Sequence, residues 1–284
     1  MLSKKIFMTG MRLFLINQGL FYKYAWHKLN RPKFSNLTGI KCINFGEVKL
    51  PIDFEYLGDT YYTRQMYHKC YQLAVIYNMG KYLRAGDTFV DIGANVGYFT
   101  AFGASLVGSK GITYSFEPIE QCYDVLVQLK QMNPGYTINA MKEAVGNRNG
   151  LGEIIYTPPP HSGGSSMVSG FLDAVECHKE GPFEVPLKRL DYYNFPRLDL
   201  VKIDVEGYEF PVLQGMEGIF KAGLRPIIIC EICPSAYPAV GHTRQDLMDF
   251  MSSWGYRSYN LFNPRIREDF RSWKSGDDVI FRVK

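Results

Sequence analysis

Acidic side chains stand at or near the ends of four apolar, β-branched stretches of this sequence. Asp91 lies in the first stretch, Glu117 follows the second, and Asp204 and Glu231 belong to two later ones. Such stretches are typical of buried strands, where a charge is costly unless it is paired or used. In open α/β sheets, ligands bind in the crevice outside the carboxyl ends of the strands. The acids therefore predict a ligand site at that edge of a sheet.

A glycine turn follows the first stretch. Gly93 and Gly97 let the backbone turn sharply and approach a ligand closely. A dinucleotide-binding fingerprint needs three glycines spaced G-x-G-x-x-G, and only two are present. Asp91, two positions before the first glycine, would repel a diphosphate but suit an amine or a sulfonium cation. This polarity favours S-adenosylmethionine over a nicotinamide dinucleotide.

Glu117, followed by Pro118, ends the second predicted strand. A carboxylate at this place holds the ribose hydroxyls of a bound nucleoside by bidentate hydrogen bonds. The alternative is a solvated acid or a charge at a helix N-terminus. Glu143 follows the third predicted strand, where its side chain or the neighbouring backbone would border the adenine ring.

A second cluster of charges follows on residues 199–209. Lys202, Asp204 and Glu206 leave the predicted strand on the same side, because strand side chains alternate with period two. Unexpected charges at strand ends indicate catalysis or substrate binding, with Asp204 as the first candidate. The alternative is a structural network of the lysine and the two acids.

Residues 150–170 are rich in glycine, serine and proline, which is more typical of a functional loop than of a linker inside a domain. His161 in this segment is a candidate base or a ligand of a substrate hydroxyl, although a lone loop histidine is usually neither.

Strands and helices alternate along the chain, which predicts a mostly parallel sheet, and two final strands without a helix between them predict an antiparallel edge. The predicted strands are 88–92, 111–116, 136–141, 199–205, 225–231, 256–262 and 278–283, the predicted helices are 63–83, 97–108, 121–132, 243–254 and one beginning at Glu209, and a hairpin turning at Gly46 is predicted within 41–52.

Composition limits the classes of function. The 32 basic and 28 acidic residues give a net charge of +4 and form no tract, so nucleic-acid binding is not expected. A hydrophobic content of 46% suffices for a large core. The six cysteines show no disulfide framework and no zinc-binding spacing, so we expect free thiols in a reducing, cytoplasmic compartment.

Residues 1–35 are basic and aromatic, without an acidic residue, and predict one or two amphipathic helices. Their longest uncharged run is too short to span a bilayer. Such a segment packs on its own domain or on a second subunit, or rests as a peripheral element on an anionic membrane surface. We therefore expect a helical extension with a small hairpin over residues 1–55 and one domain over 56–284.

Three segments, 90–97, 116–118 and 202–209, together resemble the FkbM family of S-adenosylmethionine-dependent methyltransferases over about residues 80–235. The resemblance implies an α/β fold with the seven-stranded, mostly parallel sheet of class I (Rossmann-like) methyltransferases and helices on both faces. Asn95 stands where the superfamily usually has a further glycine, and asparagine tolerates the left-handed conformation. The residues expected at the cofactor are Asp91, Gly93, Ala94, Asn95, Gly97, Glu117, Pro118, Glu143 and Asp204.

Family members mostly methylate hydroxyls of sugars or natural products, so the resemblance implies O-methylation of a small molecule or glycan. A positioned base must take the hydroxyl proton. Asp204 is the first candidate, Glu231 and His161 come next, and Lys202 would orient Asp204. Asp204 and Glu206 could also hold a divalent metal such as Mg²⁺.

Two other classes of function stay open from the sequence. One is a nicotinamide-dependent oxidoreductase, which shares the sheet and the ribose acid. The other is a non-catalytic, methyltransferase-like binding subunit. Charges retained on buried strand ends count against the second. A homo-oligomer is compatible with the sequence.

Overall fold

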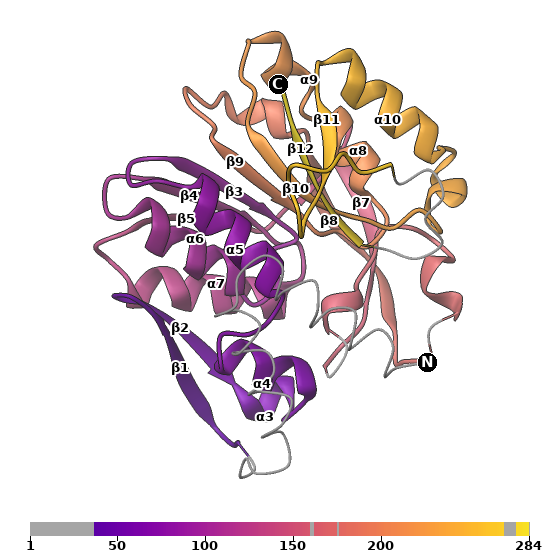
Figure 1. The fold of residues 1–284 in the computed structure, drawn as a ribbon. Coiled ribbons are helices and arrows are strands. Elements are labelled where there is room, and N and C mark those ends of the chain that lie inside the picture. Colours follow the sequence, from indigo (N-terminus) through magenta and orange to yellow (C-terminus); the bar gives the residue numbers. More distant parts are fainter. Residues whose placement is uncertain (1–36, 160–161, 175, 270–276, 284) are drawn as a thin grey trace.

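The computed structural model of the protein describes residues 37–159, 162–174, 176–269 and 277–283 (Figure 1). The predicted amphipathic helices of residues 1–35 and the candidate base His161 lie outside the described residues.

A seven-stranded sheet forms the centre of the molecule, in the order β11-β12-β10-β9-β3-β4-β5. Only β12 runs antiparallel to its two neighbours. The predicted mostly parallel sheet is therefore confirmed, with the final strand pair at one edge. The strands are β3 (Thr88–Ile92), β4 (Ile112–Phe116), β5 (Thr137–Met141), β9 (Leu200–Ile203), β10 (Ile227–Ile232), β11 (Arg257–Asn260) and β12 (Asp277–Arg282).

β3 lies between β4 and β9, and both pairings are parallel. The chain passes from β3 to β4 on one side, and the later strands β9 and β10 lie on the other. This reversal of strand order opens a crevice outside the carboxyl ends of β3 and β9, where ligands bind in open α/β sheets.

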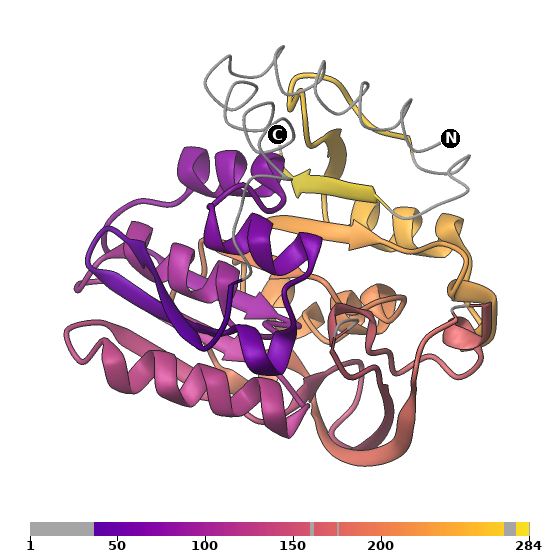
Figure 2. The same ribbon diagram turned by 90° about the horizontal axis from the view of Figure 1, so that it is seen from below.

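Helices cover both faces of the sheet (Figures 1 and 2). Alternate residues of β3 supply both cores, because Phe89 packs on one face while Val90 and Ile92 pack on the other. No helix in the described part of the chain is long and apolar enough to cross a bilayer. The helices are α5 (Leu73–Tyr82), α6 (Tyr98–Val107) and α7 (Glu120–Met132) on the first face, and α8 (Glu209–Gln214), α9 (Glu217–Lys221) and α10 (Arg244–Ser253) on the second.

The hairpin of β1 (Ile40–Phe45) and β2 (Val48–Asp53) turns at Gly46, as predicted. β2 packs on α6 and α7 (Figure 2). Val48 and Leu50 are completely buried there, so the hairpin shares the core of the first face. The predicted domain boundary at residue 55 stays a prediction.

The single helix predicted over residues 63–83 is wrong, because the structure has two helices, α4 (Tyr61–Tyr67) and α5. Between them Lys69 and Gln72 adopt φ angles of 54° and 39°, in the left-handed region that cannot continue a right-handed helix. A short helix, α3 (Phe54–Leu57), precedes α4 and begins at the cap formed by Asp53.

The loop predicted over residues 150–170 is wrong in its first part. β7 (Gly150–Tyr156) is a strand that pairs antiparallel with β8 (Glu180–Lys188), which was not predicted. Ile154 and Tyr156 point inward while the intervening positions are less buried, as in a half-buried strand. β6 (Ala144–Val145) pairs with β8 and completes a separate three-stranded sheet. The 3₁₀ helices η2 (Ser162–Gly164) and η3 (Phe171–Ala174) lie between β7 and β8, η4 (Leu190–Tyr193) follows β8, and η5 (Tyr237–Val240) follows β10.

Candidate active site

A cavity of about 480 Å³ lies at the carboxyl ends of β3, β4, β9 and β10. This is the crevice that the strand order predicts. Its size is within the range of small-molecule sites. The predicted site residues in its wall are Gly93, Ala94, Asn95, Glu117, Pro118, Glu143, Lys202, Asp204, Glu206 and Glu231.

The turn after β3 requires its glycines. Gly93 has a φ of 76°, and a Cβ there would lie 1.8 Å from the backbone oxygen of Asp204. Gly97, at φ 80°, begins α6, and a Cβ there would lie 2.8 Å from Leu126 Cδ2. Asn95 adopts a φ of 48°, so asparagine does take the left-handed conformation at the position where a further glycine is usual.

Glu117 is held rigidly in the cavity wall after β4. Its Oε2 accepts a hydrogen bond from the backbone N–H of Asn95 at 2.8 Å, and its Oε1 accepts one from Ile119 at 2.9 Å. Burial raises the pKa of Glu117 to about 7, although both hydrogen bonds oppose the rise. Each carboxylate oxygen keeps a second lone pair for a ligand hydroxyl.

Glu143, just before β6, lines the same cavity as Pro118. Its carboxylate accepts a hydrogen bond from the hydroxyl of Tyr193, which fixes the side chain. The acids after β4 and β5 therefore stand on the same side of the turn that follows β3.

Asp91 and Gly97 do not line the cavity. The Asp91 side chain is completely buried and accepts a hydrogen bond from the hydroxyl of Thr100 on α6 at 2.7 Å. Burial raises the pKa of Asp91, while the neighbouring Lys202 and the bond from Thr100 oppose the rise. Asp91 thus lies beneath the turn, where it supports Lys202 and α6.

Lys202 and Asp204 form a salt bridge beside the turn. Lys202 is 2% exposed, and its Nζ lies 2.8 Å from Asp204 Oδ2 and 4.4 Å from the centroid of the Phe99 ring. Burial opposes the charge of Lys202, but Asp204 and then Asp91 outweigh it and raise its pKa. Burial likewise disfavours the charge of Asp204, but Lys202 and a hydrogen bond from Glu231 lower its pKa.

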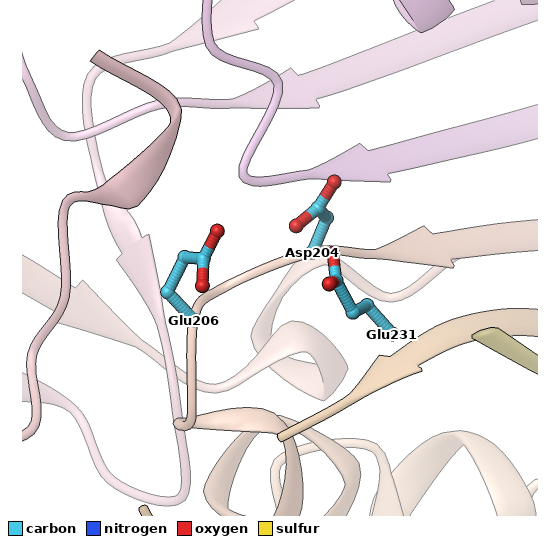
Figure 3. Close-up of side chains that lie close together, drawn as sticks. All are labelled: Asp204, Glu206 and Glu231. Atoms are coloured by element: carbon cyan, nitrogen blue, oxygen red, sulfur yellow. The ribbon is translucent and has the colours of Figure 1, made fainter. Parts of the chain in front are cut away.

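Asp204 and Glu206, in the turn after β9, lie beside Glu231 of β10 (Figure 3). One oxygen of each lies within 4.8 Å of the others. Burial, Asp204 and Glu209 raise the pKa of Glu206 to about 8. Asp204, burial and Asp278 raise the pKa of Glu231 well above its usual value. This carboxylate triad can share and accept protons, and three carboxylates can also hold a divalent cation.

The turn that carries Glu206 is fixed by two residues whose role the sequence did not predict. Glu206 itself adopts a φ of 48°, and its backbone oxygen accepts a hydrogen bond from the Ser166 hydroxyl at 2.6 Å. Glu209 is completely buried, and its Oε1 accepts a hydrogen bond from the backbone N–H of Gly207 at 2.6 Å. Glu209, expected only to begin a helix, also shapes the turn.

Two walls of the cavity come from outside the central sheet. One is the segment after β7. Its lining residues Thr157, Gly164 and Met167 lie in the predicted functional loop, and Phe171 directly follows that loop. The other comes from α4 and the connection to α5, and sequence reasoning missed it, because no glycine or proline marks the break after α4. Its lining residues are Tyr62, Thr63, Met66, Tyr71 and Gln72.

The strand order, the glycine turn after β3 and the acid after β4 define a class I methyltransferase fold. The chain matches the methyltransferase FkbM domain over residues 91–258, and it belongs to this family.

Two methyltransferases are distant relatives of the chain. The chain is 29% identical to methyltransferase sdnD of Sordaria araneosa over 163 residues, which cover 48% of this chain and 62% of that protein. It is 27% identical to hexuronic acid methyltransferase AglP of Haloferax volcanii over 141 residues, covering 48% of this chain and 52% of that protein. The matched regions thus span just over half the length of these relatives.

Among solved structures, the methyltransferase FkbM of Methylobacillus flagellatus aligns with 92% of this chain and 62% of its own, at 13% identity and a TM-score of 0.42. An O-methyltransferase from Thermotoga maritima aligns with 75% of this chain and 66% of its own, at 12% identity and a TM-score of 0.38.

Proposed function

We propose that the protein is an S-adenosylmethionine-dependent O-methyltransferase that acts on a hydroxyl of a sugar, glycan or natural product. One observation carries the proposal. A single cavity has Glu117 on one side of the turn after β3 and the salt-bridged carboxylate triad on the other. The first side suits a nucleoside, and the second suits a group that must lose a proton.

The residues present fit S-adenosylmethionine. Glu117 offers free lone pairs to the two ribose hydroxyls, while Pro118 and Glu143 border the place expected for the adenine ring. Gly93, Ala94 and Asn95 of the turn line the cavity, where the turn would lie against the methionine portion of the cofactor. The bound cofactor would supply a methyl group activated by a sulfonium.

The carboxylate triad would receive the proton of the acceptor. The bound cofactor would supply the methyl group to the acceptor oxygen and keep the electron pair of the broken carbon–sulfur bond, and the hydroxyl proton would move to a carboxylate of the triad. Asp204 is the ionised member, because Lys202 lowers its pKa, and Glu231 donates a hydrogen bond to it. Holding the acceptor in line with the methyl group supplies much of the acceleration.

Calorimetry tests the proposal at the cofactor. The purified protein is titrated with S-adenosylhomocysteine and, separately, with NAD. We expect selective binding of S-adenosylhomocysteine that Glu117→Ala removes and that Glu153→Ala, an exposed acid on β7, leaves intact. Tight NAD binding would instead support an oxidoreductase, and binding of neither ligand would support a non-catalytic subunit.

A screen of neutral, amino and acidic sugars and glycosylated natural products then tests the acceptor. S-adenosylhomocysteine production and a mass increase of one methylene group identify the product. Repeating the assay with EDTA, and with Mg²⁺ restored, tells whether the triad works with a divalent cation or as a proton acceptor alone.

A further inference from the structure

We propose that Tyr71 binds the acceptor by donating a hydrogen bond to the oxygen that is methylated, opposite the carboxylate triad. This assignment rests on the proposed function and adds a residue to it. Tyr71 lies in the connection between α4 and α5, outside the segments that resemble the family, and lines the same cavity as Glu117 and Asp204.

The backbone around Tyr71 adopts an uncommon conformation. Gln72, directly after it, has a φ of 39°, and Lys69, two residues before it, has a φ of 54°. Non-glycine residues in the left-handed region are disfavoured, and such strain clusters at ligand sites where the surrounding structure holds it. Here the conformation ends α4 and turns the Tyr71 side chain toward the cavity.

Aromatic contacts fix the Tyr71 ring beside the salt bridge. Its ring centroid lies 5.5 Å from that of Tyr98 in an edge-to-face contact and 5.9 Å from that of Phe99. Lys202 Nζ lies over the same Phe99 ring, at 4.4 Å from the centroid. Phe99 therefore contacts both Tyr71 and the ammonium that pairs with Asp204.

The Tyr71 hydroxyl remains a donor. The side-chain amide of Gln72 donates to its oxygen at 3.4 Å, so this contact does not use the phenol proton. Burial, followed by the charges of Asp204, Glu231, Asp278 and Glu206, raises the pKa of Tyr71 well above its usual value. The phenol therefore stays protonated throughout the neutral range and faces the groups that receive the acceptor proton.

This arrangement assigns each part of an acceptor hydroxyl a direction. One lone pair of the oxygen accepts the hydrogen bond from Tyr71, the proton points to the carboxylate triad, and the second lone pair faces the methyl group. The acceptor would gain the methyl group and give its proton to the carboxylate triad, while Tyr71 keeps its own proton throughout. A donor placed in this way orients the oxygen and discriminates against acceptors that cannot accept a hydrogen bond.

The test compares Tyr71→Phe with Tyr67→Phe. Tyr67 is a matched control because it lies four residues earlier, packs on Phe54 and does not line the cavity. On the acceptor that the wild type methylates best, we expect Tyr71→Phe to lower kcat about 10- to 100-fold. S-adenosylhomocysteine affinity and the melting temperature should stay at wild-type values in both variants, and Tyr67→Phe should keep wild-type kcat.

A thiol analogue of the same acceptor provides a readout that a structural role of Tyr71 would not change. Sulfur is a weak hydrogen-bond acceptor, so the loss caused by Tyr71→Phe should shrink to less than about threefold with the thiol. Equal losses with both acceptors, or wild-type kcat in Tyr71→Phe, would overturn the assignment while leaving methyl transfer intact. A wild-type protein that neither binds S-adenosylhomocysteine nor methylates any acceptor would overturn the proposed function and the assignment with it.

Discussion

Glu117 illustrates how burial tunes a single carboxylate. Two backbone N–H groups hold it, yet its pKa rises to about 7 because the side chain is only 6% exposed. Its charge therefore changes close to physiological pH, where an ordinary glutamate is fully ionised.

This shift predicts a pH dependence of cofactor binding. In the proposed complex the ionised carboxylate of Glu117 accepts hydrogen bonds from both ribose hydroxyls. The Kd of S-adenosylhomocysteine should therefore rise as the pH falls from 8 to 6 and Glu117 takes up a proton. The change approaches about tenfold per pH unit below the pKa if only the ionised form binds. Calorimetry over this range should show the slope in the wild type and a flat response in Glu117→Gln.

Glu209 is the control for this titration. Burial raises its pKa to about 7 as well, but its carboxylate bonds the backbone N–H of Gly207 and does not line the cavity. Glu209→Gln should therefore keep the wild-type slope. A slope that disappears in Glu209→Gln and persists in Glu117→Gln would show that Glu209, and not Glu117, causes the pH dependence.

For Asp204 we predict an effect on turnover. Asp204→Asn keeps the shape but removes the charge that pairs with Lys202, and we expect kcat to fall by about 100-fold or more with cofactor affinity retained. Asp199→Asn, which removes an acid paired with Arg197 at the start of the same strand, should keep kcat. Near-full turnover of Asp204→Asn would exclude it as the base.

The turn after β3 packs closely against the backbone that follows β9. Gly93 and Gly86 both have positive φ angles, 76° and 88°, so alanine strains the backbone at either position. Only at Gly93 would the added Cβ meet other atoms, whereas nothing lies within 4 Å of a Cβ at Gly86.

Comparing the two alanine variants separates backbone strain from the clash. Gly86→Ala should lower the free energy of unfolding by about 1 to 2 kcal/mol and leave cofactor binding intact. Gly93→Ala should cost more and abolish S-adenosylhomocysteine binding, since the turn must move away from Asp204. Chemical denaturation and calorimetry measure both effects, and equal behaviour of the two variants would show that the contact tolerates a methyl group.

The elements that periodicity predicts well are the buried strands. β3, β9 and β10 are short apolar runs next to acids. That pattern predicts both the strands of the sheet and the edge at which the cavity lies. β7 and β8 were missed because their partners come from distant positions and their glycines and prolines suggest a loop. The break between α4 and α5 was missed because it depends on left-handed conformations at Lys69 and Gln72, which propensity does not reveal.

Candidate site residues on the central sheet could also be predicted better than those on the outer segments. Those that end strands of the central sheet were predicted, since strand ends meet at one edge. Tyr71 and Ser166 were not, because their positions depend on how outer segments fold back onto that edge.

The charge of the whole cavity constrains the acceptor. Among the described lining residues, five are acids and the single lysine or arginine is Lys202, which is already paired. Two like charges about 6 Å apart repel by about 3 kcal/mol at an effective dielectric constant of about 20. At pH above 8, where Glu206 is ionised as well as Asp204, an acceptor that brings a further carboxylate near the methylated hydroxyl should therefore bind poorly.

Matched acceptors test this prediction. At pH above 8, we expect an analogue that carries a carboxylate beside the methylated hydroxyl to lose at least about tenfold in kcat/KM relative to its neutral parent. Glu206→Gln should reduce that difference at pH above 8, where Glu206 is ionised, and the exposed Glu153→Gln should not. A preference for the acidic analogue would mean that cations outside the described residues complete the site.

The positions of the two outer walls of the cavity in the chain bear on how the protein can evolve. One precedes β3 in the chain and the other follows β5, so both lie outside the β3–β4 segment that supplies Glu117 and the glycine turn. Under the proposed assignment, mutations in either wall can reshape the pocket for the acceptor while Glu117 and the glycine turn stay unchanged. New acceptors can then evolve by exchange of these peripheral segments while the proposed cofactor half is inherited.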